Sequence, residues 1–341
     1  MNADVRARSP DVEPLRLTLP HAALTRLRLH LAGSLASGAA LEACLAYGAP
    51  WSTLRELVRH FCDDFELERQ ALFRLPFFET EAGGQQLGFV HCRSNERSAT
   101  PILLLHGYSA ALAEFQNLIE PLSQAFHVVC PPLLGFACPR AAAAGCAELM
   151  QQLGYSRYAV HGSDLGATIA LELGAARGPD VLALHVTSAP AYPSVHELEA
   201  LTSPEKSQLA RASELHDELC FQLPESPIEE LAFALSRFDD AELMPRESLD
   251  TLLTGLALSW AMGAGEARAE HYRFHLREAP RCAAPLTVHA FPLATPSLRR
   301  FVEKRQSVVE WREHERGGCM PAIEQPELWL ETLRSFGSNL S

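Results

Sequence analysis

Apolar residues follow two different spacings along the chain and divide it into segments. Residues 14–75 carry apolar positions three and four apart, as in LPHAALTRLRLHLAG and STLRELVRHFCDDFELERQALFRL, which predicts helices. From about residue 86, short apolar runs bounded by Gly and Pro predict strands: QLGFVHCR, PILLLHG, HVVCPPLLG, YAVHGSD, ALHVTSA, LTVHAFP and SVVEWRE. Helical patterns such as FQNLIEPLSQAF and LGATIALELGAARG separate most of these runs. This alternation is typical of an α/β fold with a mostly parallel central sheet flanked by helices.

A long helical segment interrupts the alternation. Residues 193–280 show helical spacing throughout, for example in IEELAFALSRF and SLDTLLTGLALSWAMGAG. Such an insertion between two core strands predicts a cap over the carboxyl edge of the sheet, where open α/β sheets hold their sites. We therefore expect a helical N-terminal meander at 1–85, a first core part at 86–192, the helical cap at 193–280 and a second core part at 281–341.

Composition and charge narrow the class of partner. The 341 residues are 47% hydrophobic and carry a net charge of −13 with scattered Lys and Arg, which leaves no basic surface for nucleic acid or an anionic membrane. No apolar stretch of membrane-spanning length and no signal peptide is evident, so we expect a cytoplasmic protein. The expected partner is a small-molecule substrate, and a homo-oligomer is compatible with the sequence. The nine cysteines lack regular spacing and any CxxC pair, so we expect reduced thiols, no metal site and no cofactor.

The segment YAVHGSDLGATIALELG carries the clearest candidate for chemistry. A strand is predicted to end at His161, and GSDLG at 162–166 then turns sharply into a helix, with Asp164 at the centre of the turn. A carboxylate at this position attacks an alkyl carbon, opening an epoxide or displacing a halide to form an ester on the enzyme. The alternative is that Asp164 caps the following helix. Ser163 lies one place from the centre, a register that the glycines do not support for a serine nucleophile.

A second glycine turn follows an earlier strand. In PILLLHGYSAALAEF, His106, Gly107 and Tyr108 come directly after the predicted strand. A backbone N–H from this location usually joins the N–H of the residue after the nucleophile, here Leu165, in an oxyanion hole. The alternative is a tight turn with no role in chemistry.

Several linked motifs resemble one known family. The segments RLPFFETEAGGQQLGFVHCRS, LLLHGY, HVVCPPLLGF, HGSDLG, LLTGLALSWAMGAG and RGGCMPAIEQPEL follow one another over nearly the whole chain. Together they resemble the epoxide hydrolases of the microsomal and juvenile-hormone type. The resemblance implies an α/β-hydrolase fold with a helical N-terminal meander, in which the aspartate matched by Asp164 attacks an epoxide. It also implies two cap tyrosines that donate hydrogen bonds to the epoxide oxygen, and a histidine, oriented by an acid, that activates water to hydrolyse the ester.

Three of the positions that the resemblance marks as catalytic carry other residues. Tyr272 matches one cap tyrosine, but the second falls near Cys220 and Phe221, which have no phenol. The acid expected after Phe-Pro is Ala294, and the expected Gly-Gly-His ends in Cys319. No His or Lys adjoins this cysteine in sequence to lower its pKa, so we do not expect it to replace the histidine.

Three interpretations stay open. The first is a non-hydrolytic enzyme in which Asp164 acts as general base or electrostatic group and Tyr272 as acid or hydrogen-bond donor, giving cyclisation, isomerisation or elimination in specialised metabolism. The second is a true hydrolase with a relocated base, for which the candidates are His314, His289 and His161. Each of these can equally be a satisfied or an exposed histidine with no role in catalysis. The third is a non-catalytic protein that binds an apolar ligand or a partner.

Overall fold

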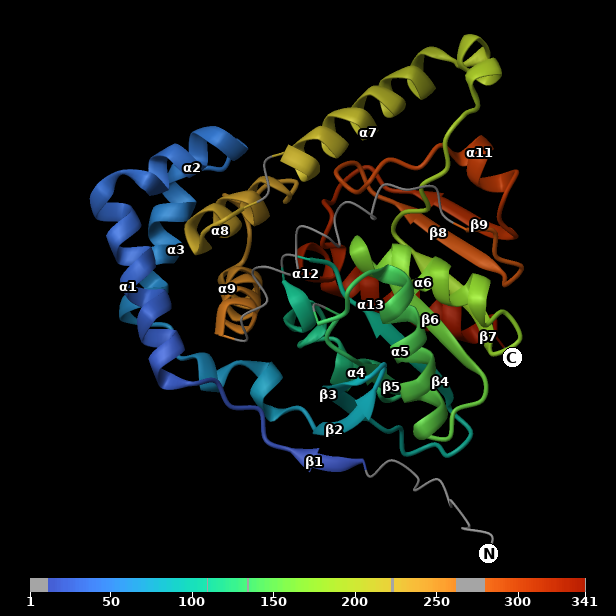
Figure 1. The fold of residues 1–341 in the computed structure, drawn as a ribbon, viewed down its shortest axis with the longest axis horizontal. Helices are drawn as coiled ribbons and strands as arrows, with labels where there is room; N and C mark the ends of the chain where they lie inside the picture. The colour runs from blue at the N-terminus through green and yellow to red at the C-terminus, as the bar shows by residue number, and fades with distance from the viewer. Residues whose placement is uncertain (1–11, 109, 134, 222–223, 262–279, 341) are drawn as a thin grey trace, which may run out of the picture.

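Nine strands in the part of the chain that the structure describes form one sheet (Figure 1). The computed structural model describes residues 12–108, 110–133, 135–221, 224–261 and 280–340, without the side chains of 215–221. The strand order is β1-β2-β3-β5-β4-β6-β7-β8-β9. The strands are β1 (Glu13–Leu15), β2 (Phe77–Ala82), β3 (Gln85–Cys92), β4 (Thr100–Leu105), β5 (Phe126–Cys130), β6 (Tyr158–Gly162), β7 (Val181–Val186), β8 (Leu286–Ala290) and β9 (Val308–Glu313).

The pairing directions confirm the mostly parallel sheet that the sequence predicts. Antiparallel pairs join β1 to β2, β2 to β3 and β3 to β5. Parallel pairs join β5, β4, β6, β7, β8 and β9 in that order. The carboxyl ends of the parallel strands therefore lie along one edge of the sheet, where the loops after β4, β6 and β8 can build a common site.

Helices cover both faces of the sheet and form a separate layer beside it. They are α1 (His21–Ser37), α2 (Ala39–Tyr47), α3 (Trp51–Asp63), α4 (Ile119–Leu122), α5 (Pro139–Gln152), α6 (Leu165–Ala176), α7 (Ser203–Phe221), α8 (Pro227–Ser236), α9 (Arg246–Ala261), α11 (Arg299–Glu303), α12 (Pro321–Glu324) and α13 (Pro326–Ser338). Short 3₁₀ helices are η1 (Leu67–Arg69), η2 (Ala71–Arg74), η3 (Ala111–Phe115) and η4 (Val195–Ala200).

The alternation of side chains along the strands divides the core into two layers. On β6, Val160 packs with Leu171 of α6 and other residues of α5 and α11 on one face. Ala159, one residue earlier, packs on the other face with Ile119 of α4 and Trp329 of α13. Successive strand residues point to opposite faces, so both faces of the central strands are apolar and both need a helical cover.

A third apolar cluster joins the N-terminal helices to the cap. Leu31 of α1 and Leu57 of α3 are fully buried in one cluster with Leu231 of α8 and Leu253 of α9. Figure 1 shows α1 to α3 beside α8 and α9, away from the sheet. The cap helices are thus held by the meander on one side, while α9 also packs against η3.

The structure corrects the predicted helical segment before residue 86. Residues 13–15 and 77–82 are strands of the sheet, so the predicted boundary at 85 falls inside the β2–β3 hairpin. The second predicted helix ends at Asp63 and continues as the 3₁₀ turns η1 and η2. FFETEA became a strand because β3 pairs with it along its whole length, a partner that local spacing does not reveal. Within the described residues no single helix is long and apolar enough to cross a membrane, although α1 and α2, bent by 85°, pass that test as a pair.

Candidate active site

Asp164 occupies the sharp turn between β6 and α6. Its φ of 47° and ψ of −118° lie in a region that residues with side chains rarely adopt. A Cβ on Gly162 would lie 2.3 Å from the carbonyl oxygen of Gly166, and one on Gly166 would lie 2.0 Å from that of Leu105. Both glycines are therefore required for close backbone approach, as the motif predicts.

The carboxylate of Asp164 points to the loop after β4 and makes no capping hydrogen bond to α6. The alternative of a helix cap is therefore wrong. The N–H of Tyr108 donates to Asp164 Oδ2 at 3.0 Å, and the N–H of Asp164 donates to Thr187 Oγ1 at 3.2 Å. An ester formed through Oδ1 would leave Oδ2 as the carbonyl oxygen, already facing a backbone donor. This is the geometry of an oxyanion hole at Tyr108.

His106 and Gly107, two further predicted members of the oxyanion hole, hold the loop after β4 in place, while the role of the Leu165 N–H stays a prediction. His106 is fully buried; its Nδ1 donates to the carbonyl of Gly107 at 2.6 Å, and its Nε2 accepts from the N–H of Leu133 at 3.1 Å. Burial lowers the pKa of His106 to about 4, so the imidazole is neutral and both nitrogens are occupied. Leu165 is buried at the start of α6, directly after Asp164.

A carboxyl group that the sequence did not single out lies next to Asp164. Glu114 of η3 is 2% exposed; its Oε1 accepts from the Ser163 hydroxyl and its Oε2 from the Gly107 N–H, each at 2.6 Å. Burial raises the pKa of Glu114 to about 8, and the charge of Asp164 contributes. The Ser163 side chain is fully buried and its hydroxyl donates a hydrogen bond to Glu114, so it is not positioned to act as a nucleophile. The one available signal was an acidic residue inside the apolar run ALAEF.

Cys319 lies close enough to Asp164 for the charge of the carboxylate to raise the pKa of its thiol. Burial raises the pKa of Cys319 well above its ordinary value, and the charge of Asp164 raises it further. Its N–H donates to the carbonyl oxygen of Arg237 at 3.4 Å, which ties the loop before α12 to the end of α8. The thiol is therefore protonated at neutral pH and serves neither as a base nor as an activated nucleophile.

The segment that carries Ala294 adjoins the loop that carries Cys319. The N–H of Leu293 donates to the carbonyl oxygen of Gly317 at 3.4 Å, and a Cβ on Gly317 would meet the ring of Phe291 at 2.7 Å. Ala294 is 4% exposed. The two positions at which the sequence lacks an acid and a histidine thus lie on neighbouring segments.

Comparisons with known proteins match the chain to two domain families and to named relatives. A family profile described as "Epoxide hydrolase N terminus" matches residues 12–115, and one described as "alpha/beta hydrolase fold" matches residues 100–248. The chain is 26% identical over 369 residues to a Stigmatella aurantiaca protein provisionally named an epoxide hydrolase, covering 95% of this chain and 84% of the relative. It is 24% identical to epoxide hydrolase 1 of Sus scrofa over 366 residues, covering 85% and 80%.

The chain thus carries a match to an epoxide hydrolase N-terminal domain followed by an α/β-hydrolase domain, and the relatives that cover most of its length are named epoxide hydrolases. Its fold is the α/β-hydrolase fold. The solved structure of Aspergillus niger epoxide hydrolase superposes with a TM-score of 0.77 at 22% identity, covering 98% of this chain and 97% of that one. The match spans the meander, the core and the cap together.

Two predicted cap positions fall where the structure describes no side chain. Tyr272 lies outside the described residues, in 262–279. Cys220 lies near the end of α7, where the structure describes the backbone but not the side chains. Their roles therefore stay predictions.

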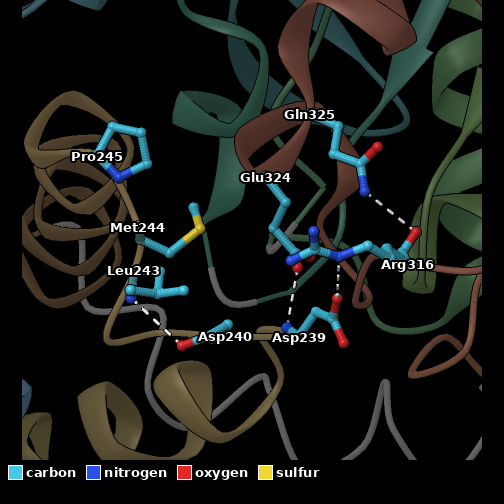
Figure 2. Close-up of a pocket in the computed structure, with 8 residues that line it drawn as sticks. All are labelled: Asp239, Asp240, Leu243, Met244, Pro245, Arg316, Glu324 and Gln325. Atoms are coloured by element: carbon cyan, nitrogen blue, oxygen red, sulfur yellow. Dashed lines mark hydrogen bonds and ion pairs between the residues drawn. The ribbon is translucent and has the colours of Figure 1, made fainter.

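A pocket of about 270 Å³, lined by both charged and apolar side chains, lies where the cap meets the loop before α12 (Figure 2). Glu324 lines it and accepts hydrogen bonds from the N–H groups of Gly318, at 2.8 and 2.9 Å, and Asp239, at 3.0 Å. Arg316 lies 3.5 Å from the Asp239 carboxylate. Burial raises the pKa of Glu324 to about 7. Glu324 therefore clamps the loop of Cys319 to the start of the segment after α8.

The candidates for a relocated base form a row across the sheet face that α13 covers. The rings of His161, His185, His289 and His314 follow one another with centroids 5.2, 4.8 and 5.1 Å apart. Trp329 packs edge-on against the first three. No group of three or more His, Cys, Asp or Glu in the described residues could hold a metal ion, and the cysteines with described side chains are free thiols.

Burial keeps this row neutral. It lowers the pKa values of His161 and His289 to about 3, with neighbouring histidines contributing, and it lowers that of His314 as well. The nitrogens also contact each other, His161 Nδ1 to His185 Nδ1 at 3.1 Å and His289 Nδ1 to His314 Nε2 at 2.9 Å. His161, His185 and His289 are thus packed core groups and His314 is partly buried at the end of the row, and none of the four has the environment of a base.

We expect the row to destabilise the protein in acid. The folded pKa values lie below the ordinary value of 6.5, so stability is complete above that pH and falls as the pH drops toward 3. His161 and His289 each cost about 2 kcal/mol between pH 7 and pH 5. Urea unfolding at the two pH values measures this loss. In His161→Phe, the loss of unfolding free energy between the two pH values should be smaller by the contribution of one histidine. The control His196→Phe, at an exposed position, should show the same loss as the wild type. An equal loss in both variants would show that His161 does not cause this destabilisation.

Proposed function

We propose that this protein acts on a small apolar or epoxide-derived substrate without an activated water. Asp164 would serve as base or electrostatic group and Tyr272 as acid or hydrogen-bond donor in a cyclisation, isomerisation or elimination, a chemistry suited to specialised metabolism. The observation that supports this proposal is Cys319. A protonated, partly buried thiol lies near Asp164 at the position where the family resemblance implies the histidine.

The location of Ala294 also favours this proposal. It adjoins the Cys319 loop, so the acid and the base implied by the resemblance are absent from one place. Removing the base of such a pair costs several orders of magnitude in rate, because the ester then waits on unactivated water. A reaction that needs no hydrolytic step avoids this loss.

A second candidate is epoxide hydrolysis with a different base. Two observations favour it: the relatives carry epoxide hydrolase names, and the N–H of Tyr108 faces Asp164 Oδ2, as an ester intermediate requires. A non-catalytic binding protein is the third interpretation. We propose a small-molecule partner and a cytoplasmic location in all three cases.

Labelled water separates the candidates. The protein is incubated with a panel of terminal and internal epoxides in ¹⁸O water, and both small molecules and intact protein are weighed by mass spectrometry. We expect no ¹⁸O-labelled diol above the uncatalysed rate, and a persistent adduct on Asp164 with the most reactive epoxides. Labelled diol in amounts exceeding the enzyme would overturn the proposal in favour of hydrolysis. Absence of both diol and adduct would favour the binding protein.

A further inference from the structure

The carboxyl group of Glu114 bridges the two segments that build the site. One oxygen accepts from the N–H of Gly107, the residue before Tyr108, and the other from the hydroxyl of Ser163, the residue before Asp164. Both hydrogen bonds measure 2.6 Å, which is just below the usual range for N–H···O and within the usual range for O–H···O. A single side chain thus ties the loop after β4 to the nucleophile turn.

Consecutive backbone donors connect Glu114 to Asp164. The N–H of Gly107 points to Glu114 and the next one, of Tyr108, to Asp164 Oδ2 at 3.0 Å. A Cβ on Gly107 would lie 3.3 Å from both Asp164 Oδ2 and Glu114 Oε2. The two carboxyl groups therefore flank the same glycine.

We propose that Glu114 is a positioning residue for Asp164: as a protonated carboxyl it fixes the Gly107–Tyr108 amides, and loss of its proton changes the hydrogen bond that Tyr108 makes to Asp164. This inference rests on the proposed role of Asp164 as the reacting carboxylate. Burial and the charge of Asp164 raise the pKa of Glu114 to about 8, so the proton is held at neutral pH. In this protonated state Glu114 would donate to the Ser163 hydroxyl oxygen, whereas the ionised carboxylate accepts from that hydroxyl.

The surroundings leave Glu114 as the group that titrates near pH 8. Titratable groups that interact with it are Asp164, Cys130 of β5 and Cys319; Glu324 of α12 interacts with Cys319. Burial raises the pKa values of both thiols well above their ordinary value. Toward η3, α9 contributes Thr251, which accepts from Gln116, and Gly255, which lies against Ala110; neither titrates. The pKa of Glu324 is raised only to about 7.

The amide of Tyr108 reports on this arrangement directly. Labelling with ¹⁵N-tyrosine gives six backbone signals, and Tyr108→Phe identifies the one that belongs to Tyr108. We expect its chemical shift to titrate with a midpoint near pH 8 in the wild type and to stay constant in Glu114→Gln. Glu324→Gln, the matched control, should retain the titration. A constant wild-type signal, or a titration that survives in Glu114→Gln, would overturn the proposal.

If Glu114 acted only through its hydrogen bonds and not through its proton, Glu114→Gln would behave like the wild type. Glutamine can accept from Gly107 and donate to Ser163, so it replaces the bridge but not the proton. The folded state keeps a proton that the unfolded state loses, so wild-type stability falls as the pH rises from about 4.5 to about 8, and Glu114→Gln should gain in relative stability over that range. Ser163→Ala removes a hydrogen bond that lowers the pKa of Glu114, and it should move the Tyr108 midpoint upward; an unmoved midpoint counts against the bridge.

The pH dependence of the alkylation rate of Asp164 tests whether Glu114 affects its reactivity. With an epoxide that alkylates Asp164, the alkylation rate should show an inflection near pH 8 in the wild type that Glu114→Gln loses. An inflection retained in the variant would overturn the role of Glu114. Failure of every epoxide to react would instead count against the proposed function of Asp164, and the Tyr108 titration would still decide the role of Glu114.

Discussion

Replacing Asp164 with asparagine is expected to lower adduct formation with reactive epoxides, and turnover of any natural substrate, by at least about 10³-fold. The side chain lies at the turn between β6 and α6 and is held by the N–H of Tyr108. Asparagine keeps an acceptor for that N–H but has no carboxylate to attack carbon or to remove a proton. The fold should therefore survive while the chemistry is lost.

The matched control is Asp180→Asn. Asp180 directly precedes β7, at the amino edge of the sheet and opposite to Asp164, so the same change there should leave the rate unaltered. Intact mass after incubation measures the adduct, and thermal unfolding checks the fold. Conversion of a substrate at an undiminished rate in Asp164→Asn would show that Asp164 is not the reacting group.

Combining Ala294→Glu with Cys319→His is expected to create diol formation, with a gain of about 10²-fold or more in ester hydrolysis. The hydrogen bond from Leu293 to Gly317 shows that the two segments adjoin, and Cys319 lies near Asp164. An imidazole at 319 would then be placed to activate water, with the carboxylate at 294 orienting it.

Stability offers an independent check of that pair. Ala294 is 4% exposed, so glutamate alone would be a buried carboxylate without a partner and should cost about 3 kcal/mol. The histidine should recover part of this cost, which a double-mutant cycle of unfolding free energies measures. Adding Asp164→Asn to the pair must abolish the new diol. A stable, coupled pair that forms no diol would show that restoring the acid and the base is not sufficient for hydrolysis.

The strength of the sequence-based interpretation differed from one part of the site to another. Asp164 and its glycines were predicted because a strained turn needs particular residues at adjacent positions, and the structure confirms the close approach of Gly162 and Gly166 to backbone oxygens. The helix-cap alternative was equally local and is wrong, because the carboxylate points to Tyr108. Orientation of a side chain depends on the neighbour it meets.

The histidines illustrate the same limit. His161, His289 and His314 were separate candidates in sequence, and only the parallel order β6-β7-β8-β9 brings them into one row with His185. Their low pKa values follow from that packing. A histidine in a strand pattern does not reveal whether its neighbours are water, a carboxylate or other histidines.

The sequence by itself determined the strand and helix alternation, the nucleophile turn and the absence of an acid and a histidine at 294 and 319. These features depend on residue identity and on spacing over a few positions, and both can be read directly from the sequence. Only the tertiary structure decided that β2 joins the sheet, that the Ala294 segment meets the Cys319 loop, and that Glu114 bridges Gly107 and Ser163. Those contacts join residues from separate elements. Burial between the elements, not position in the chain, sets the protonation of Glu114 and Cys319.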